Sequence, residues 1–262
     1  MEIKNSTILI TGGSSGIGLE FVKQLMQQNA TVIITGRDMD KLEQAKKQFP
    51  KLHVIQNDVS NPKDIEELYQ KVTTQFPELN IIINNAGIMR QLDLQKTNLS
   101  TENITKEIEI NLSGTIRMIH QFLPHLKAKN SAAIVNVSSG LAFVPFSVSP
   151  IYSATKAGVH SYTQALRLQL KNTTIKVFEL APPGTETPLM DEFADVVDNN
   201  QNMKVDKMVS IAINGILKDK LEIRPGLANI LKIMSRIAPG FIVKILDKTA
   251  ENAKKKSTKL KS

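Results

Sequence analysis

Two side chains that could move a proton stand four residues apart, within Tyr152-Ser153-Ala154-Thr155-Lys156-Ala157-Gly158. A helix would place Tyr152 and Lys156 on one face. A free phenol titrates near ~10, which is too high for efficient proton exchange at neutral pH. Because a nearby ammonium group favours the phenolate, we expect Lys156 to lower the pKa of Tyr152. The pair predicts general acid–base chemistry.

Ser139 precedes Tyr152 by thirteen residues and follows a predicted strand. Its hydroxyl could donate a hydrogen bond to a substrate oxygen and stabilise the charge that develops on a carbonyl during hydride attack. Each residue also has a plainer interpretation: the tyrosine and lysine as surface residues, Ser138-Ser139 as a strand end, and Asn111 as a polar residue on a helix. We interpret them together because a glycine-rich turn lies upstream.

That turn is Thr11-Gly12-Gly13-Ser14-Ser15-Gly16-Ile17-Gly18, between the first predicted strand and the first predicted helix. Glycines let the backbone turn tightly and approach a pyrophosphate, whose charge suits the exposed N–H groups of a helix N-terminus. An ordinary strand–helix connection is the alternative. In this position the turn predicts dinucleotide binding.

Short β-branched runs alternate with longer segments that have apolar residues at helical spacing. The predicted strands are Thr7–Thr11, Thr31–Thr35, Leu52–Gln56, Leu79–Ile83, Ala132–Val137 and Ile175–Leu180. The predicted helices cover 16–29, 38–49, 62–76, 103–129 and 151–171. Successive apolar residues such as Ile81-Ile82-Ile83 are typical of strands covered on both faces. The pattern predicts an α/β fold of Rossmann type, a doubly wound parallel sheet in a single domain.

These motifs resemble those of the short-chain dehydrogenase/reductase family. The turn at 11–18 has that family's Thr-Gly-x-x-x-Gly-x-Gly spacing, and Asn84-Asn85-Ala86-Gly87 resembles its Asn-Asn-Ala-Gly motif. Asn111, in Asn111-Leu112-Ser113-Gly114, matches the family's catalytic asparagine, and Ser139, Tyr152 and Lys156 complete the set. The resemblance covers roughly residues 5–225 and includes all of these motifs in the family's order.

The resemblance implies a catalytic tetrad of Asn111, Ser139, Tyr152 and Lys156, in which Lys156 also holds the nicotinamide ribose and Asn111 anchors a water. The nicotinamide would perform the redox step. The residues expected to bind the cofactor are Gly12, Ser14, Ser15, Gly16, Ile17, Gly18, Arg37, Asp58, Val59, Asn85, Ala86, Gly87, Tyr152, Lys156, Pro182 and Thr187.

The choice of cofactor depends on the end of the second predicted strand. An NAD-type site would place an acid there against the ribose 2′-hydroxyl, but this position is Gly36. Arg37 follows and can pair with a 2′-phosphate. Asp38 is the competing acid, and we interpret it as the N-cap of the next helix. We therefore expect NADP(H) in preference to NAD(H).

Beyond the sixth predicted strand, Ala181-Pro182-Pro183-Gly184-Thr185-Glu186-Thr187 resembles the family's Pro-Gly-x-Val-x-Thr segment. Pro183 stands where the family has glycine, and a proline has no N–H to donate to the nicotinamide. Together with Ser138-Ser139-Gly140-Leu141-Ala142-Phe143-Val144-Pro145, the double proline most resembles the DltE-type bacterial reductases.

The main domain is expected to cover residues 1–225, with a substrate lid near 183–204; a plain surface loop is the alternative. Residues 226–262 are expected to form a C-terminal helical segment of the same domain with a basic tail. Leu227–Leu246 is apolar but contains Lys232, Arg236, Pro239 and Lys244, which argues against a membrane span. We favour packing beside the substrate mouth, and a peripheral membrane contact is the less favoured alternative.

The net charge of +8 is half explained by the tail Ala250–Ser262, where five lysines against Glu251 give +4. No aromatic residue interrupts those lysines, so we expect no nucleic-acid partner. The absence of cysteine excludes disulfides and thiol catalysis. No metal site is expected, because the four histidines, His53, His120, His125 and His160, lack ligand spacing.

The chain is therefore predicted to be a cytoplasmic NADP(H)-dependent oxidoreductase that acts on a small carbonyl or alcohol, since no export signal is visible. The family resemblance implies a homodimer or homotetramer assembled through the helices at 103–129 and 151–171. A redox-sensing regulator that binds the dinucleotide without turnover is the alternative from a different functional class.

Overall fold

The computed structural model describes residues 1–95, 98–193, 196 and 202–261. At its centre is a parallel sheet of seven strands in the order β3-β2-β1-β4-β5-β6-β7. The strands are β1 Thr7–Thr11, β2 Thr31–Gly36, β3 His53–Gln56, β4 Leu79–Asn84, β5 Ala132–Val137, β6 Ile175–Leu180 and β7 Glu222–Ile223. The six predicted strands are confirmed to within one residue at each end. β7 was missed because two residues show no periodicity.

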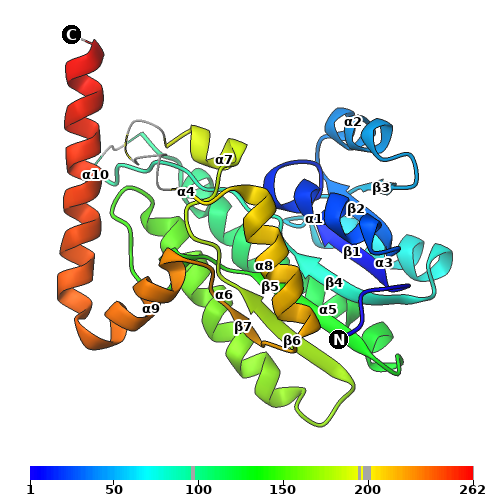
Figure 1. The fold of residues 1–262 in the computed structure, drawn as a ribbon. Helices are drawn as coiled ribbons and strands as arrows, with labels where there is room; N and C mark the ends of the chain where they lie inside the picture. Colours follow the sequence, from blue (N-terminus) through cyan, green and yellow to red (C-terminus); the bar gives the residue numbers. More distant parts are fainter. Residues whose placement is uncertain (96–97, 194–195, 197–201, 262) are drawn as a thin grey trace.

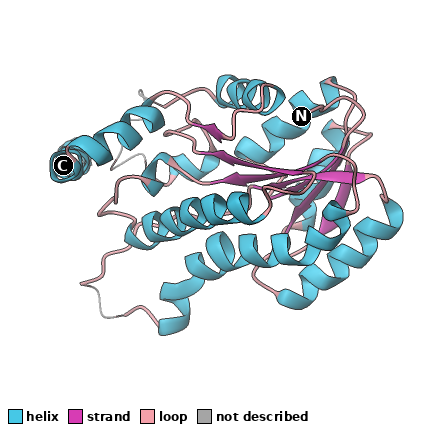
Figure 2. Ribbon diagram, turned by 90° about the horizontal axis from the view of Figure 1, so that it is seen from below, coloured by secondary structure: helices cyan, strands magenta, loops and turns pink. Residues whose placement is uncertain are grey.

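Helices cover both faces of the sheet (Figures 1 and 2). The side chains of a strand point alternately to the two faces, so Ile8 and Ile10 pack on one side and Leu9 on the other. The first face is covered by α1 Gly16–Gln27, α2 Met39–Gln48 and α8 Val205–Leu217. The second is covered by α3 Pro62–Gln75, α5 Gly114–Lys127 and α6 Pro150–Gln169. The predicted doubly wound α/β fold is thereby confirmed.

The single helix predicted at 103–129 was wrong in one respect. The segment consists of α4 Thr101–Glu107, a π-helical turn at Ile108–Ser113 and then α5. A π-turn is wider than an α-turn and is found mostly at functional sites. Asn111 lies in it, and its backbone carbonyl accepts a hydrogen bond from Thr115 Oγ1 at 2.9 Å. Periodicity did not reveal the turn, because a local change in pitch leaves the apolar pattern nearly unchanged.

The lid region begins with the short helix α7 Pro188–Asp191. Phe193 and Val196 are buried beyond it, in the same apolar cluster as Tyr152. Residues 194–195 and 197–201, also part of the predicted lid, lie outside the described residues, so the predicted lid motion stays a prediction.

The chain ends in two helices, α9 Leu227–Ile237 and α10 Pro239–Lys261, as the predicted C-terminal helical segment required. α9 packs on the short 3-10 turn Gly140–Ala142, where a methyl group added at Gly140 would lie 3.2 Å from Leu231. α10 runs along one side of the molecule, and its C-terminal end projects beyond the body (Figure 1, red). Among the described residues, every helix is too short or too polar to cross a membrane.

Candidate active site

The strand order reverses beside β1, which has β2 on one side and β4 on the other. Loops that leave the carboxyl ends of neighbouring strands diverge at such a point and open a crevice for ligands. The predicted motifs meet at this edge: the glycine turn follows β1, Asn85-Ala86-Gly87 follows β4, and Ser139 follows β5. The topology therefore brings three segments that are distant in sequence to one place.

The glycine turn lies directly against the Asn85-Ala86 segment. Gly12 has φ of +65°, and an added methyl group would lie 2.9 Å from the Cα atom of Ala86. At Gly18 such a methyl would lie 2.2 Å from the Gly12 carbonyl oxygen, so the turn requires glycine. Asn85 donates its side-chain amide to the carbonyls of Thr11, at 3.1 Å, and Gly12, at 2.9 Å. Its amide therefore braces the turn.

The N-terminus of α1 has the features of an anion site. Ser15 is the N-cap, and within the described residues its hydroxyl makes no capping hydrogen bond. The first turn also contains no acidic residue, so its N–H groups and the positive end of the helix can face a phosphate. Gly16, at φ of +51°, brings this turn against Thr187, whose Cβ would lie 3.3 Å from an added methyl. Thr187 thus lies against the glycine turn, and its role in cofactor binding stays a prediction.

The expected choice of cofactor depends on two side chains after β2, those of Arg37 and Asp38. Asp38 accepts a hydrogen bond from the backbone N–H of Lys41 at 3.1 Å, which confirms its assignment as the N-cap of α2. Arg37 is exposed, and in the described part of the chain no hydrogen bond or ion pair engages its guanidinium. A methyl at Gly36 would be 3.5 Å from Ser14 Oγ, so Ser14 borders the same site.

The loop after β3 contains Asp58 and Val59, two of the residues expected to bind the cofactor. The Asp58 carboxylate accepts hydrogen bonds from the N–H and hydroxyl of Ser60, at 2.9 and 2.6 Å, and so shapes its own loop. Val59 is buried beneath Gly114.

Asn57, in the same loop, is a residue that the sequence analysis missed. It is 3% exposed, and its side-chain amide has no hydrogen-bond partner among the described residues. A buried amide without a partner is costly and would suit a ligand with polar edges.

The four predicted catalytic residues come together beside Gly87. A methyl group at Gly87 would lie 3.2 Å from Asn111 Oδ1 and 3.5 Å from Lys156 Nζ. Lys156 donates to the Val137 carbonyl at 2.8 Å, and its Nζ is 5.6 Å from the centre of the Tyr152 ring. The Ser139 side chain lies near enough to the Tyr152 phenol to lower its pKa, and Ser139 Oγ accepts the Leu141 N–H at 3.1 Å. The structure therefore brings Asn111, Lys156 and Tyr152 together with Ser139, and their catalytic roles stay a prediction.

Asn111 holds the loop after β4 through its side chain. Oδ1 accepts the Ile88 N–H at 2.8 Å, and Nδ2 donates to the Ile88 carbonyl at 2.8 Å and to Thr155 Oγ1 at 3.2 Å. The amide thus joins the π-turn to both the β4 loop and α6. Its contacts keep Gly87 beside Lys156.

The expectation that Lys156 lowers the pKa of Tyr152 was wrong for the protein alone. Burial raises the pKa of Tyr152 to about 12, against the lowering effect of the hydrogen bond with Ser139. The Glu107 carboxylate adds to the increase. Burial also lowers the pKa of Lys156 to about 8. Desolvation disfavours the charged form of both groups, and this effect on the two pKa values outweighs the attraction expected between an ammonium and a phenolate on one helix face.

Glu107 is a second residue that the sequence analysis missed. It is completely buried one turn before Asn111, and its carboxylate accepts the backbone N–H of Arg90 at 3.0 Å. Burial raises the pKa of Glu107, while the Arg90 guanidinium, 3.4 Å away, opposes the increase. Its position four residues before Asn111 was the available signal, because residues at that spacing share a helix face.

The surroundings of Tyr152 are apolar. Its cluster consists of Met89, Phe146, Phe193, Val196 and Ala250, with Leu141 and Met190 packed against it. Ala250 belongs to α10, and Phe193 and Val196 to the predicted lid. Leu141 therefore lies beside the reacting groups. Phe143 instead packs edge-on against His160, with 5.0 Å between the ring centres.

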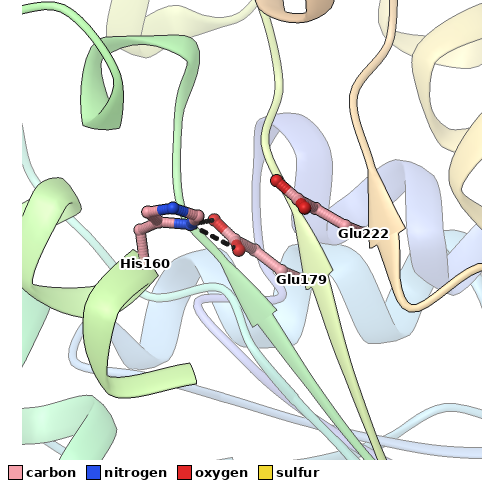
Figure 3. A group of neighbouring side chains, drawn as sticks. All are labelled: His160, Glu179 and Glu222. Atoms are coloured by element: carbon pink, nitrogen blue, oxygen red, sulfur yellow. Dashed lines mark hydrogen bonds and ion pairs between the residues drawn. The ribbon is translucent and has the colours of Figure 1, made fainter. Parts of the chain in front are cut away.

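Three ionisable residues lie close together next to Ser138: His160 of α6, Glu179 of β6 and Glu222 of β7 (Figure 3). His160 Nδ1 is 2.7 and 2.9 Å from the two Glu179 oxygens, and Ser138 Oγ donates to Glu179 at 2.5 Å. Glu222 pairs with Lys232 and Arg224. Such a trio could hold a metal ion, but basic side chains of the chain already neutralise Glu222. The cluster was not predicted from the sequence, because its members come from three separate elements.

The segment after β6 lies beside the catalytic loop. Gly140 donates its N–H to the Pro182 carbonyl at 2.8 Å, which ties this segment to the residue that follows Ser139. The Pro183 carbonyl accepts the Thr185 hydroxyl at 2.9 Å. Pro182 and Thr187 therefore border the same edge of the sheet, and Pro183 contributes a carbonyl to its own turn.

Comparisons with known proteins agree with this geometry. A family model described as short chain dehydrogenase matches residues 6–198. The chain is 40% identical over 224 residues to the uncharacterised oxidoreductase DltE of Bacillus subtilis, which covers 85% of this chain and 89% of DltE. The predicted resemblance to DltE-type proteins is therefore confirmed.

Two solved structures are also similar. One is a short-chain dehydrogenase of Sphingobium yanoikuyae in complex with NADPH, with a TM-score of 0.77, 27% identity, and coverage of 90% of this chain and 94% of that one. The other is a 3-ketoacyl-(acyl-carrier-protein) reductase of Brucella melitensis complexed with NADH, with a TM-score of 0.74, 27% identity, and coverage of 82% and 91%. Together with the family match, they support a nicotinamide dinucleotide cofactor. The chain belongs to the short-chain dehydrogenase/reductase family of oxidoreductases and is similar to DltE.

Proposed function

We propose that this protein catalyses NADP(H)-dependent interconversion of a small carbonyl and the corresponding alcohol, with Tyr152 as the general acid and base. One observation carries the proposal: the buried phenol of Tyr152 lies beside the buried amine of Lys156, 5.6 Å from the ring centre, with Ser139 next to it at the ligand-binding edge of the sheet. When bound, the nicotinamide exchanges a hydride with the substrate carbon. The protein has to manage the proton and the charge on the substrate oxygen.

The raised pKa of Tyr152 keeps the phenol in its protonated form. With a pKa of about 12, the phenol is fully protonated at neutral pH and has a proton to give to an alkoxide. Ser139 can donate a hydrogen bond to the same oxygen as its charge develops. Lys156, with a pKa of about 8, is mostly charged at pH 7 and would stabilise the phenolate that remains after the transfer. Asn111 would hold the β4 loop in place and anchor a water through which Tyr152 regains its proton.

The preference for NADP(H) rests on Arg37 and Asp38. A free guanidinium can form two parallel hydrogen bonds with a 2′-phosphate. Asp38 turns its carboxylate to Lys41 N–H, away from the role of ribose acceptor. The glycine turn, Ser14, Ser15 and Ile17 would face the pyrophosphate, and Asn57, Asp58 and Val59 the adenine.

We further propose a cytoplasmic protein that assembles as a dimer or tetramer through α5 and α6. Apolar side chains are exposed on both helices, Ile116 at 36% and Leu168 at 70%. Burial of such residues between subunits is a common source of association energy. Light scattering of the protein and of Leu168→Lys tests the interface, because a lysine there would favour the monomer.

The function is tested by NADPH oxidation against a broad panel of aldehydes and ketones. Tyr152→Phe removes only the hydroxyl and should reduce turnover by about 10²–10⁴-fold, the range for general acid catalysis, while calorimetry should show a much smaller loss of NADPH affinity. A mutant that turns over as fast as the wild type would exclude Tyr152 as the acid. NADPH binding with no turnover of any carbonyl would favour the redox-sensing regulator instead.

A further inference from the structure

The solvent side of the C-terminal helices carries a row of large apolar residues. They recur every three or four residues and are between 42% and 75% exposed: Leu227, Ile230, Ile233, Ile237, Phe241 and Ile245. We call this row the C-terminal stripe. Surface helices normally expose polar residues on that side. Exposed apolar helix faces of this kind usually mark a site of interaction.

The stripe is separate from the faces with which α9 and α10 pack against the rest of the protein. α9 uses its other side for that purpose, where Ala228 is fully buried and Leu231 approaches Gly140. α10 likewise buries Ile242 and Ala250. Both helices are therefore apolar on two sides, and only one of these sides is covered within the described chain.

Positive charge is concentrated in the same two helices. Residues 227–261 contain eight lysines and Arg236 against only Asp247 and Glu251, a net charge of +7 from the chain's total of +8. Arg236, Lys244 and Lys248 are exposed. Five further lysines belong to the last turns of α10, which at 23 residues is about 34 Å long.

We propose that the C-terminal stripe docks on the surface of an anionic lipid bilayer. An amphipathic helix with apolar side chains on one face and lysines beside them lies in the interface, where the apolar groups enter the acyl boundary and the ammonium groups meet lipid phosphates. An anionic bilayer would bind both the exposed apolar side chains and the positive charges of α9 and α10. The contact is peripheral, since neither helix can span the membrane.

Charge decides between a lipid surface and the other possible occupants. A second copy of the chain would cover the isoleucines, but it would also bring two segments of +7 together. A nucleic acid would neutralise the lysines, but its phosphate backbone gains nothing from isoleucines, and the only aromatic residue in the stripe is Phe241. An anionic bilayer complements both the charge and the apolar side chains.

Docking there would bring the candidate active site close to the membrane surface. α9 packs on the turn after Ser139, and Ala250 of α10 belongs to the cluster around Tyr152. Asp247 of α10 also accepts the Ser147 hydroxyl at 2.5 Å. The proposed surface and the site are therefore parts of one packed unit.

The chain has no tryptophan, so a single introduced tryptophan reports on one position. Phe241→Trp places the reporter in the stripe, and Met39→Trp places a matched reporter at an exposed position on α2, at the far end of the sheet. The full-length variants are mixed with vesicles of phosphatidylcholine alone or with 40 mol% phosphatidylglycerol, on the order of the anionic fraction that attracts polybasic helices. We expect a blue shift for Phe241→Trp with the anionic vesicles only, and none for Met39→Trp.

Flotation of the wild type with the same vesicles measures affinity. Ile233→Gln/Ile237→Gln should weaken binding at least tenfold, while Met39→Gln leaves it unchanged, and 0.5 M salt should weaken the wild type. Equal flotation of the wild type and the double variant, or no blue shift, would overturn the proposal. So would concentration-dependent dimerisation that the double variant abolishes, which would assign the stripe to a second copy, or binding of duplex DNA in preference to vesicles.

Discussion

Replacement of Arg37 by alanine should change the choice of cofactor and leave the fold intact. The side chain is exposed at the end of β2, and its guanidinium makes no hydrogen bond or ion pair in the described part of the chain. Its removal therefore costs the free protein very little. Any effect must appear in the complex with a cofactor that carries a 2′-phosphate.

The size of the effect follows from the exposure of the site. A hydrogen bond to a charged group contributes about 1.5–3 kcal/mol. Because Arg37 is exposed, solvent screening favours the lower end of that range. About 1.4 kcal/mol corresponds to a factor of ten, so Arg37→Ala should raise the Kd for NADPH roughly tenfold. The Kd for NADH should change by less than about threefold, because its ribose has no phosphate for Arg37 to contact.

Gly36→Asp provides the complementary change. A Cβ at Gly36 would meet Ser14 Oγ at 3.5 Å and Leu42 at 3.6 Å, ordinary contact distances, so the fold can accept the side chain. Its carboxylate would accept a ribose hydroxyl and repel a 2′-phosphate. Gly36→Asp/Arg37→Ala should therefore bind NADH in preference to NADPH.

Titration calorimetry with both cofactors is the assay, and Asp38→Ala is the matched control. Loss of the Asp38 cap should cost about 1 kcal/mol of stability without changing the ratio of the two Kd values. Equal losses of NADPH and NADH affinity in Arg37→Ala would refute the assignment of Arg37. A shift in the ratio for Asp38→Ala would show that Asp38, and not Arg37, contacts the ribose.

Three further predictions concern the interior of the site. Asn111→Ala leaves the N–H and carbonyl of Ile88 without partners and should lower the free energy of unfolding by about 2–3 kcal/mol in urea titrations. Glu179→Ala leaves His160 Nδ1 without its buried acceptor and should cost about 3 kcal/mol, a fall in Tm of roughly 6–12 °C by calorimetry. For carbonyl reduction, kcat/KM should be flat below pH 8 and fall above it, as Lys156, with its pKa of about 8, loses its charge. Lys156→Arg keeps its charge and should remove this decline; an unchanged profile would contradict the role of Lys156.

The central strands of the sheet were predictable because they are buried on both faces. Runs of successive apolar residues such as Ile81-Ile82-Ile83 predict a central parallel strand. The π-turn at Ile108–Ser113 was not predictable, since an extra residue per turn alters hydrogen bonding more than the spacing of apolar side chains. β7 depends on pairing with β6 and not on its own sequence, so it could be found only in the folded chain.

The site was predictable where the distance along the chain determines the distance in space. Tyr152 and Lys156 share a helix face, and the glycine turn and Asn85-Ala86 follow neighbouring strands. Asn57 lacked such a signal, because what distinguishes it is the absence of a partner in a buried place. The C-terminal stripe lacked one for the opposite reason. Its apolar residues fit a packed helix equally well until the structure showed which side faces solvent.

The pKa values of Tyr152 and Lys156 show why a correct pair of residues led to an incorrect electrostatic expectation. In sequence, the pair suggests an ammonium that lowers the pKa of a phenol. In the folded chain both groups are buried, and burial favours the neutral form of each, so the phenol reaches about 12 and the amine about 8. The charge of Lys156 then acts most strongly on the phenolate that forms when Tyr152 gives up its proton. A charged Lys156 would offset part of the cost of burying the phenolate, so we expect proton transfer to depend on the charge of Lys156.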